Sequence, residues 1–251
     1  MSEARVAVYG SQDPQYHHAF QVFLDHTDQK VKALAWLENR VASLPSRRVL
    51  IDAGAGTGQL TAWVGESFER IIAIEPNTSL RDDLRKNCPK ADISGAMLLD
   101  AQPAARGDFI LCSHVFYYIE AAQWLPHLEK LASWLSDQGV LAIALQNSGT
   151  DCQRMVQHFF KQRFDLAALS RDFESRHAKE FQVKIDTVDA WIATPAFTEA
   201  YIIAEFMLNL LPMPNPPARL ELEDYVRKNL ADGKGGYRFS CHQDFLQVQR
   251  K

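Results

Sequence analysis

The sequence is poor in cysteine and lacks long apolar runs, and each shortage excludes a class of protein. Its four cysteines form no CxxC pair and do not combine with histidines at the spacing of a zinc site. We therefore interpret them as reduced thiols and expect no metal, with His17, His18 and His26 at the surface. No apolar run approaches the length of a membrane span, and Met1–Gly10 lack the charged-then-apolar pattern of a signal peptide. These absences predict a cytoplasmic protein without a membrane partner.

Positive charge is also scarce, which bears on the partners of the protein. There are 27 Lys and Arg against 31 Asp and Glu, giving a formal net charge of −4. No basic stretch offsets this balance, so neither a phosphate backbone nor an anionic lipid surface is a favoured partner. We expect a small-molecule partner and no nucleic acid. The sequence leaves the oligomeric state open and favours a monomer.

Strand and helix signals alternate through the first two thirds of the chain. Residues 13–43 carry apolar positions at helical spacing, broken near Asp25–Asp28, and predict two helices ahead of the first strand. The strands that follow are expected at Val49–Ala53, Ile71–Glu75, Ile93–Leu98, Phe109–Ser113 and Val140–Leu145, with helices at Thr57–Phe68, Thr78–Asn87 and Gln123–Leu135. Because each parallel strand needs a crossover back to the same edge, the alternation predicts an α/β fold with a mostly parallel sheet.

Beyond Thr150 the pattern is less regular. Helices are expected at Gln153–Lys161, Phe197–Leu210 and Arg219–Leu230, and the prolines of residues 212–217 end the second of them. The stretch up to Lys179 is mixed. One strand is expected from Val183 into Trp191, and a last strand over Tyr237–Val248.

The turn after the first predicted strand carries the clearest chemical signal. It consists of Asp52 followed by Gly54, Ala55, Gly56 and Gly58. Glycines in a strand-to-helix turn let the backbone approach a ligand closely. A dinucleotide fingerprint requires its third glycine at position 59, where this chain has Gln59. Asp52 is also hard to place beside a pyrophosphate, and it suits a cofactor with a cationic amino-acid tail and no phosphate, as in S-adenosylmethionine.

Acidic residues after the second and third strands extend this site. Glu75, followed by Pro76, stands where a carboxylate can accept both ribose hydroxyls of a cofactor. The alternative for Glu75 is a solvated acid at a strand end. Asp100, or its neighbour Leu99, is expected beside the adenine.

These residues resemble the motifs of class I S-adenosylmethionine-dependent methyltransferases, and three segments narrow the resemblance to the histamine N-methyltransferase family. The segments are Gln15–His26, His114–Ile119 with its paired tyrosines, and Gly235–Phe245. The resemblance implies a Rossmann-like fold with a seven-stranded, mostly parallel sheet, an antiparallel C-terminal strand and an N-terminal helical cap. It also implies a single domain, in which 1–44 form the cap or substrate lid, 45–150 the cofactor-binding half, and 151–251 the substrate-side elements and closing strands.

The resemblance further implies roles for individual residues. Ser113 and His114 belong to the cofactor side, and His114 and Tyr117 are the candidate catalytic residues. The expected substrate residues are Tyr16, Phe20, Gln29, Tyr117, Tyr118, Phe197 and Cys241. The amine-recognising glutamate of the family falls on Gln29, an asparagine near Cys241, and two pocket tryptophans on Gln153 and Gln157, so histamine itself is not the expected substrate. The alternative for Tyr117, Tyr118, Phe20 and Phe197 is a place in the core.

The expected reaction is methyl transfer to an amine or imidazole nitrogen of a small molecule, leaving S-adenosylhomocysteine. Because an amine attacks only when unprotonated, its methylation is expected to rise with pH. Methylation of a hydroxyl or carboxylate, with His114 or a nearby acid as base, is the alternative within the enzyme class. A binding module that has lost catalysis is the alternative outside it. The segment Ser113–Phe116 lacks the proline-proline-aromatic motif of enzymes that methylate base amines.

Overall fold

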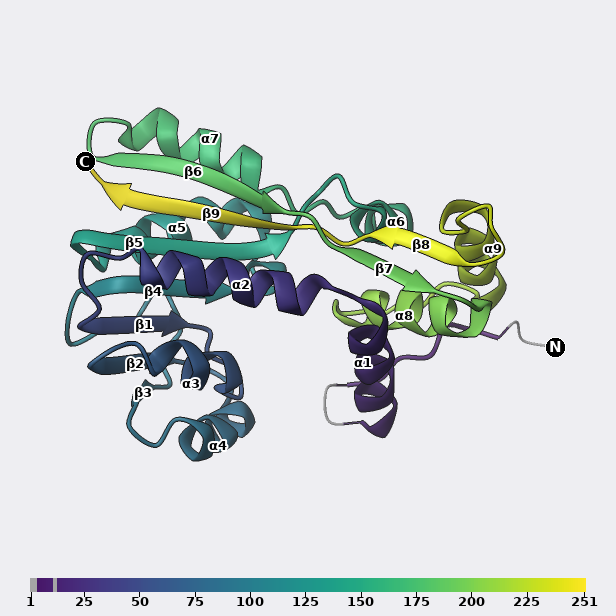
Figure 1. Ribbon diagram of the computed structural model, residues 1–251, viewed down its shortest axis with the longest axis horizontal. Helices are drawn as coiled ribbons and strands as arrows, with labels where there is room; N and C mark the ends of the chain where they lie inside the picture. Colours follow the sequence, from purple (N-terminus) through teal and green to yellow (C-terminus); the bar gives the residue numbers. More distant parts are fainter. Residues whose placement is uncertain (1–3, 11–12) are drawn as a thin grey trace. The chain divides into compact units, whose positions relative to one another are not determined.

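The computed structural model describes residues 4–10 and 13–251, which form two compact units made of interleaved segments (Figure 1). Residues 34–145, 165–187 and 244–251 form one unit, here called the large-sheet unit. The described part of 1–33, together with 146–164 and 188–243, forms the other, here called the small-sheet unit. The single domain expected from the sequence stays a prediction. Its three segments do not coincide with the two units.

A seven-stranded sheet organises the large-sheet unit, in the order β3-β2-β1-β4-β5-β9-β6. These strands are β1 (Val49–Ala53), β2 (Arg70–Ile74), β3 (Asp92–Ser94), β4 (Gly107–Ser113), β5 (Leu135–Gln146), β6 (Phe181–Val188) and β9 (Gln243–Arg250). The pairs from β3 through β5 are parallel, and the arrow of β9 runs against its neighbours (Figure 1). The predicted Rossmann-like fold with a mostly parallel sheet and an antiparallel C-terminal strand is therefore confirmed.

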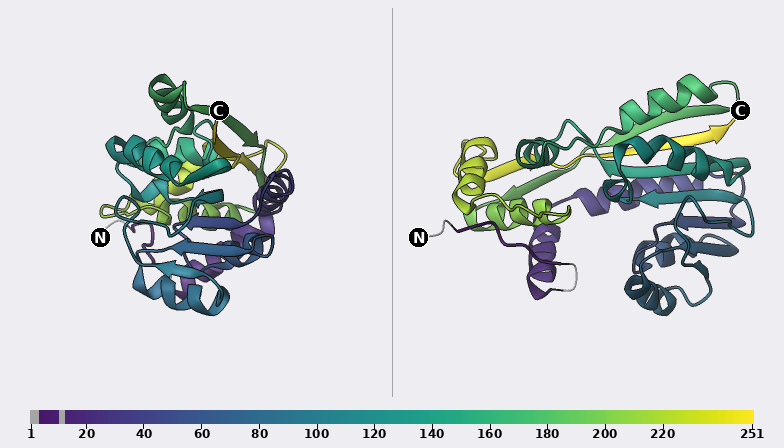
Figure 2. Two further views of the ribbon diagram at one scale, coloured as in Figure 1. Left: turned by 90° about the vertical axis from the view of Figure 1, so that its left-hand side faces the viewer. Right: turned by 180° about the vertical axis from the view of Figure 1, so that it is seen from behind.

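Helices cover both faces of this sheet. The C-terminal part of α2 (Gln29–Ala42) and α3 (Gln59–Gly65) lie on one face, and α5 (Trp124–Ser133) and α7 (Leu166–His177) on the other (Figures 1 and 2). The helix α4 (Thr78–Asn87) joins β2 to β3. Burial of the apolar strands between these layers supplies the main driving force for folding.

Trp36 joins α2 to the strands β9 and β6. Its ring stacks on Phe245 of β9 with centroids 3.9 Å apart, and its indole N–H donates to Asp186 of β6 at 3.2 Å. A buried indole thus has both an apolar partner and an acceptor, as such rings require.

A two-stranded antiparallel sheet and four helices make up most of the small-sheet unit. The elements are β7 (Trp191–Thr194), β8 (Tyr237–Ser240), α1 (Pro14–His26), α6 (Asp151–Phe160), α8 (Phe197–Asn209) and α9 (Arg219–Asn229). The apolar helix α8 is mostly buried. The segment 4–9 is fastened beside the start of α9, because Val6 N–H donates to Pro217 O at 3.0 Å and Arg219 N–H donates to Ala4 O at 2.8 Å.

Some of the predicted strands are wrong in extent, and the one expected over Ile93–Leu98 ends at Ser94. The stretch Val183–Trp191 contributes to both β6 and β7, and Tyr237–Val248 to both β8 and β9, so each passes from one sheet to the other. The points at which the two stretches leave one sheet for the other are joined by a hydrogen bond, which Cys241 N–H donates to Ala190 O at 2.9 Å. The stretch before Lys179, expected to be mixed, contains α7, which begins after Asp165 caps the N–H of Ala168.

Candidate functional site

The glycine turn predicted from the sequence joins β1 to α3 and is held by the backbone of β2. The N–H groups of Gly54 and Ala55 both donate to Ile74 O, at 2.8 and 3.1 Å. Gly54 lies so close to Val115 that a Cβ on it would stand 2.3 Å from a Val115 methyl carbon. Only glycine allows the loop after β4 to approach the turn this closely.

Gly56 has the opposite surroundings. Its φ is +56°, and a Cβ built on it meets no heavy atom within 4 Å among the described residues. The turn therefore presents bare backbone to open space, whereas Gly58 at the start of α3 is packed against Leu84 and Cys88. A ligand can therefore approach the backbone of Gly56 closely.

Glu75 closes one side of this turn. One carboxylate oxygen accepts a hydrogen bond from the Gly56 N–H at 2.9 Å, and the other accepts from the Asn77 N–H at 2.8 Å. The residue is only 7% exposed. The alternative of a solvated acid is therefore wrong. We call the region bounded by Asp52, Gly56 and Glu75 the cradle.

Arg81 of α4 supports the cradle, a role that was not predicted from the sequence. Its guanidinium donates to the backbone oxygens of Glu75 and Pro76, at 2.8 and 2.6 Å. Gly95 leaves room for it, because a Cβ there would stand 3.0 Å from the guanidinium. Neither position belongs to a recognisable motif: the hydrogen bonds of Arg81 reach back five and six residues along the chain, and the place of Gly95 depends on the pairing of β2 with β3.

Asp52 lies beneath the turn, and its charge is unfavourable there. The Thr61 hydroxyl donates to its carboxylate at 2.6 Å. Burial, together with the nearby charge of Glu75, raises the pKa of Asp52 to about 6, against the effect of the Thr61 hydrogen bond. Among the described residues no cation pairs with Asp52. A ligand that brings positive charge to this carboxylate relieves the cost of its burial.

The predicted adenine residues lie on the turn after β3. Asp100 is exposed, and its N–H donates to Met97 O at 3.0 Å. Met97 and Leu99, on the same turn, expose 62% and 39% of their surface. The adenine role of Asp100 stays a prediction.

The end of β4 brings His114 to the glycine turn through its neighbour Val115. Ser113 is the last residue of β4, and His114 follows with a φ of +59°, a conformation uncommon for a side chain other than glycine. Its N–H donates to Ala144 O at 2.9 Å, which holds this backbone in place. Removal from water lowers the pKa of His114 to about 4, so its imidazole is neutral at pH 7.

The paired tyrosines after His114 differ from each other. The Tyr117 ring stacks on the His114 ring with centroids 5.8 Å apart. Tyr118 is 69% exposed, so the alternative of a core position is wrong for it. Phe116 is the core residue of this short 3₁₀ turn and packs edge-on against Trp124 at 5.5 Å.

The other expected substrate residues belong to the small-sheet unit, where two of them meet. The Gln29 side-chain amide donates to Cys241 O at 2.6 Å. The Cys241 thiol lies 3.5 Å from the Thr27 hydroxyl, and burial raises the pKa of Cys241 to about 12. Gln29 and Cys241 thus form one contact, at the break between β8 and β9. Their role toward a substrate stays a prediction.

The remaining aromatic residues of that set take part in packing. Tyr16 and Phe20 stack on each other at 6.2 Å, and both contact Phe206 of α8. Phe197 begins α8, and the Arg227 guanidinium lies 4.0 Å from the centroid of its ring. At the positions of the family's two tryptophans, Gln153 is buried with its amide donating to Gln146 at 2.9 Å, and Gln157 is exposed.

The described residues contain no candidate metal site and no candidate membrane span. No group of three or more His, Cys, Asp or Glu side chains in 4–10 and 13–251 is arranged to hold a metal ion. No helix of the described chain is long and apolar enough to cross a membrane. His17 and His18 are exposed, as expected, and the half-buried His26 ring contacts Val22 O at 2.8 Å.

The cradle offers a defined set of chemical groups to a ligand. Asp52 has a carboxylate without a cationic partner among the described residues, Gly56 has bare backbone, and Glu75 has lone pairs that its backbone donors leave unused. S-adenosylmethionine carries an ammonium group and two ribose hydroxyls, which match these groups. The open space at Gly56 is the observation that admits it.

Comparisons with known proteins identify a family and a shared fold. The family model described as a methyltransferase domain matches residues 24–184, more than half of the chain. A protein called an uncharacterized methyltransferase from Alkaliphilus oremlandii (strain OhILAs) is 28% identical over 94 residues, which are 38% of this chain and 44% of that protein. One with the same description from Staphylococcus carnosus (strain TM300) is 23% identical over 172 residues, covering 62% of this chain and 81% of the relative.

A solved structure extends the likeness along the chain. The N-methyltransferase NodS from Bradyrhizobium japonicum WM9, in complex with S-adenosyl-L-homocysteine, matches with a TM-score of 0.55 and 11% identity. The match covers 95% of this chain and 99% of that structure. At this identity the likeness shows a shared fold.

Proposed function

This chain belongs to the methyltransferase-domain family, with S-adenosylmethionine as its cofactor, and we propose that it methylates a nitrogen atom of a small-molecule amine or imidazole. The observation that carries the proposal is the cradle, where two buried acids flank bare backbone that faces open space. The nitrogen acceptor is suggested by the resemblance to the histamine N-methyltransferase family in the segments Gln15–His26, His114–Ile119 and Gly235–Phe245. NodS shares the fold and does not by itself choose the acceptor.

In the proposed site, Asp52 pairs with the ammonium of the cofactor, and Glu75 accepts the ribose hydroxyls. When bound, the cofactor supplies an activated methyl group on a sulfonium. The protein has to align the nucleophile with that methyl group and exclude water, because the displacement needs no metal and no covalent enzyme intermediate. Arg81 takes part as a positioning residue, since it fixes the backbone that carries Glu75.

His114 and Tyr117 are proposed to orient the acceptor and to shield it from water. A neutral imidazole both donates and accepts one hydrogen bond, and the stacked Tyr117 ring limits its rotation. A histidine whose pKa is near 4 is a weak base at neutral pH, so deprotonation of a hydroxyl by His114 is not favoured. An amine that has lost its proton in solution needs no such base. This contrast supports an amine nitrogen over a hydroxyl oxygen as the acceptor atom.

The proposal is tested by measuring release of S-adenosylhomocysteine with a panel of biogenic amines, imidazoles, phenols, thiols and carboxylates. Turnover confined to amines or imidazoles supports it, and turnover confined to phenols, thiols or carboxylates contradicts the nitrogen acceptor. Calorimetry with S-adenosylhomocysteine is done in parallel. A folded protein that binds no cofactor would contradict the roles proposed for the cradle itself.

A further inference from the structure

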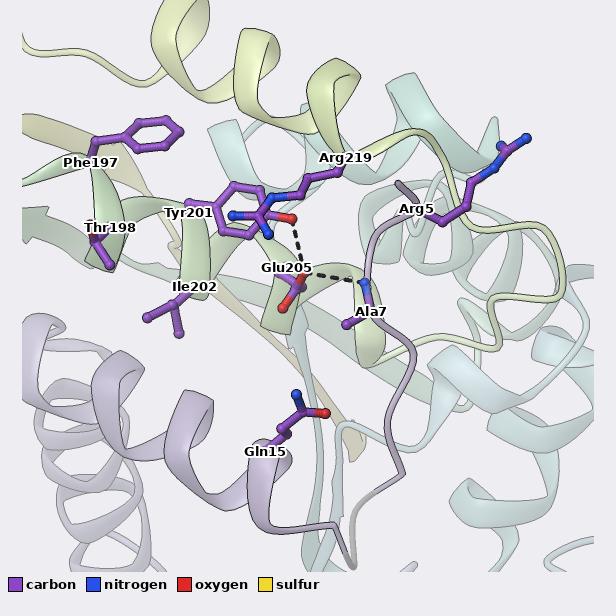
Figure 3. Close-up of a pocket in the computed structure, with 9 residues that line it drawn as sticks. All are labelled: Arg5, Ala7, Gln15, Phe197, Thr198, Tyr201, Ile202, Glu205 and Arg219. Carbon is purple, nitrogen blue, oxygen red and sulfur yellow. Dashed lines mark hydrogen bonds between the residues drawn. The ribbon is translucent and has the colours of Figure 1, made fainter. Parts of the chain in front are cut away.

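The small-sheet unit contains a pocket that shares no residue with the cradle (Figure 3). Its volume is about 330 Å³, within the range of about 300–1,000 Å³ that is usual for small-molecule sites. It is lined by one face of α8, together with Arg5, Ala7, Gln15 of α1 and Arg219 of α9. It shares Phe197 with the acceptor residues expected from the resemblance.

The wall formed by the segment 5–9 is fastened to α8 on both sides. Asn209 accepts from the Tyr9 N–H at 3.0 Å and donates to Ala7 O at 2.9 Å. The Ala7 N–H donates to Glu205 at 3.3 Å. These bonds lie within the protein itself and hold the wall in place. The pocket is therefore preformed, and little free energy is needed to order it when a ligand binds.

Glu205 brings to this pocket a carboxylate with one oxygen that no described donor reaches. One of its carboxylate oxygens accepts from the Tyr201 hydroxyl at 2.9 Å and from the Ala7 N–H. No donor among residues 4–10 and 13–251 reaches the other oxygen. Figure 3 shows that oxygen turned away from Tyr201, toward the side where Gln15 lies. A half-buried carboxylate oxygen of this kind is an acceptor for N–H donors of a ligand.

The two arginines of the pocket have hydrogen-bond partners other than Glu205, although the charge of Arg219 also acts on Glu205. The Arg219 guanidinium lies 5.2 Å from the centroid of the Tyr201 ring, and its Nε donates to Glu223 at 2.9 Å. The Arg5 guanidinium donates to Pro216 O at 3.1 Å and points away from Glu205 in Figure 3. The free acceptor that faces the pocket interior is therefore the carboxylate, with the apolar side chain of Ile202 beside it.

We propose that this pocket is a second small-molecule site, which binds a compact organic ammonium compound. The ammonium group donates to the open oxygen of Glu205, and the apolar body packs against Ile202 and the Tyr201 ring. The site holds its ligand in the protonated form, which cannot act as a methyl acceptor, so it is a binding site and not a place of reaction. The proposal does not depend on the acceptor of the methyl transfer.

The test is calorimetry with three probes of one shape: benzylammonium, benzyl alcohol and benzoate. Benzylammonium is expected to bind at least about tenfold more tightly than the other two, since hydrogen bonds to a charged group are the strong ones. Glu205→Gln keeps an acceptor for Tyr201 and Ala7 but removes the charge, and it should lower the benzylammonium affinity about tenfold or more. Glu174→Gln, which changes the net charge equally at an exposed position of α7, is the matched control and should leave the affinity unchanged.

A second variant separates the pocket from the charge. Ile202→Trp fills the pocket while leaving Glu205 in place, and it should remove benzylammonium binding. Each variant is checked for S-adenosylhomocysteine binding, so that loss of the fold or of the cradle is recognised independently. Three results would overturn the proposal: equal binding of benzyl alcohol, preference for benzoate, or undiminished benzylammonium binding by Ile202→Trp.

Discussion

Glu75 and Gly56 are joined by a hydrogen bond of 2.9 Å between a carboxylate oxygen and a backbone N–H. The acid expected to hold the ribose therefore also ties the end of β2 to the glycine turn. Because both of its oxygens accept from backbone donors, the carboxylate has a fixed orientation before a cofactor arrives. Such preorganisation lowers the ordering cost of binding.

Replacing Glu75 should therefore weaken cofactor binding more than a single lost contact would. In Glu75→Gln the amide N–H₂ must face one of two backbone donors, Gly56 or Asn77, so one buried hydrogen bond is lost together with the charge. We expect S-adenosylhomocysteine to bind about 10- to 100-fold more weakly by calorimetry. Glu69→Gln, at an exposed position just before β2, is the control. Equal affinity in Glu75→Gln and the wild type would contradict the ribose role.

Gly56→Arg should abolish cofactor binding. The new side chain occupies the open space at the turn, and the φ of +56° adds backbone strain. Gly233→Arg is a matched control, because Gly233 has a φ of +72° and open surroundings but belongs to the small-sheet unit. Calorimetry should show no binding to a folded Gly56→Arg protein and normal binding to Gly233→Arg. Retained binding in Gly56→Arg would mean that the cradle is misplaced.

Cofactor affinity should depend on pH through Asp52. Its pKa of about 6 means that the carboxylate is ionised above pH 6 and protonated below. The affinity for S-adenosylhomocysteine should therefore be constant near pH 7 and fall below pH 6, by up to about tenfold per pH unit. Thr61→Val removes the hydrogen bond that stabilises the ionised form, so the midpoint should move to higher pH. A profile that is flat from pH 5 to 7.5 would exclude Asp52 as the partner of the ammonium group.

Asp52→Asn should stabilise the cofactor-free protein at neutral pH. The pKa of Asp52 is raised from 3.8 to about 6 on folding, so the folded state retains a proton that the unfolded state loses first. Below about pH 4 both states are protonated, and there is no penalty. As the pH rises from 4 to 6 the penalty grows to about 3 kcal/mol and then stays constant.

Asparagine does not titrate and keeps an acceptor for Thr61, so the free energy of unfolding should increase by about 1–3 kcal/mol at pH 8 and by less at pH 5. Urea denaturation at the two pH values measures this difference. A gain that is the same at both pH values would show that ionisation of Asp52 is not its cause.

The parts of the fold that were predicted well are those whose signals are local. The apolar run Val49–Ala53 and the helix Thr78–Asn87 occur with the expected bounds, because their apolar patterns lie within the segments themselves. The glycine turn occurs where the sequence places it for the same reason, since the strand Val49–Ala53 and the glycines that follow it lie within ten residues of sequence. The cofactor roles of Asp52, Gly56 and Glu75 stay a prediction.

What could not be predicted depends on contacts between distant segments. Alternating side chains continue through Cys241, so the sequence gives no sign that the strand leaves one sheet there and joins another. Gly95 lies against the Arg81 guanidinium only because β3 pairs with β2. The open oxygen of Glu205 depends on a segment about 200 residues away, whose backbone satisfies the other oxygen.

The chain passes five times from one compact unit to the other, at residues 33–34, 145–146, 164–165, 187–188 and 243–244. Neither unit is therefore a continuous stretch that could be obtained by trimming the termini. A fragment ending at Thr150 retains the glycine turn but loses β6 and β9, and with them the stacking partner of Trp36. Expression of half the gene should thus give an insoluble product, and a single proteolytic nick should leave the two pieces associated.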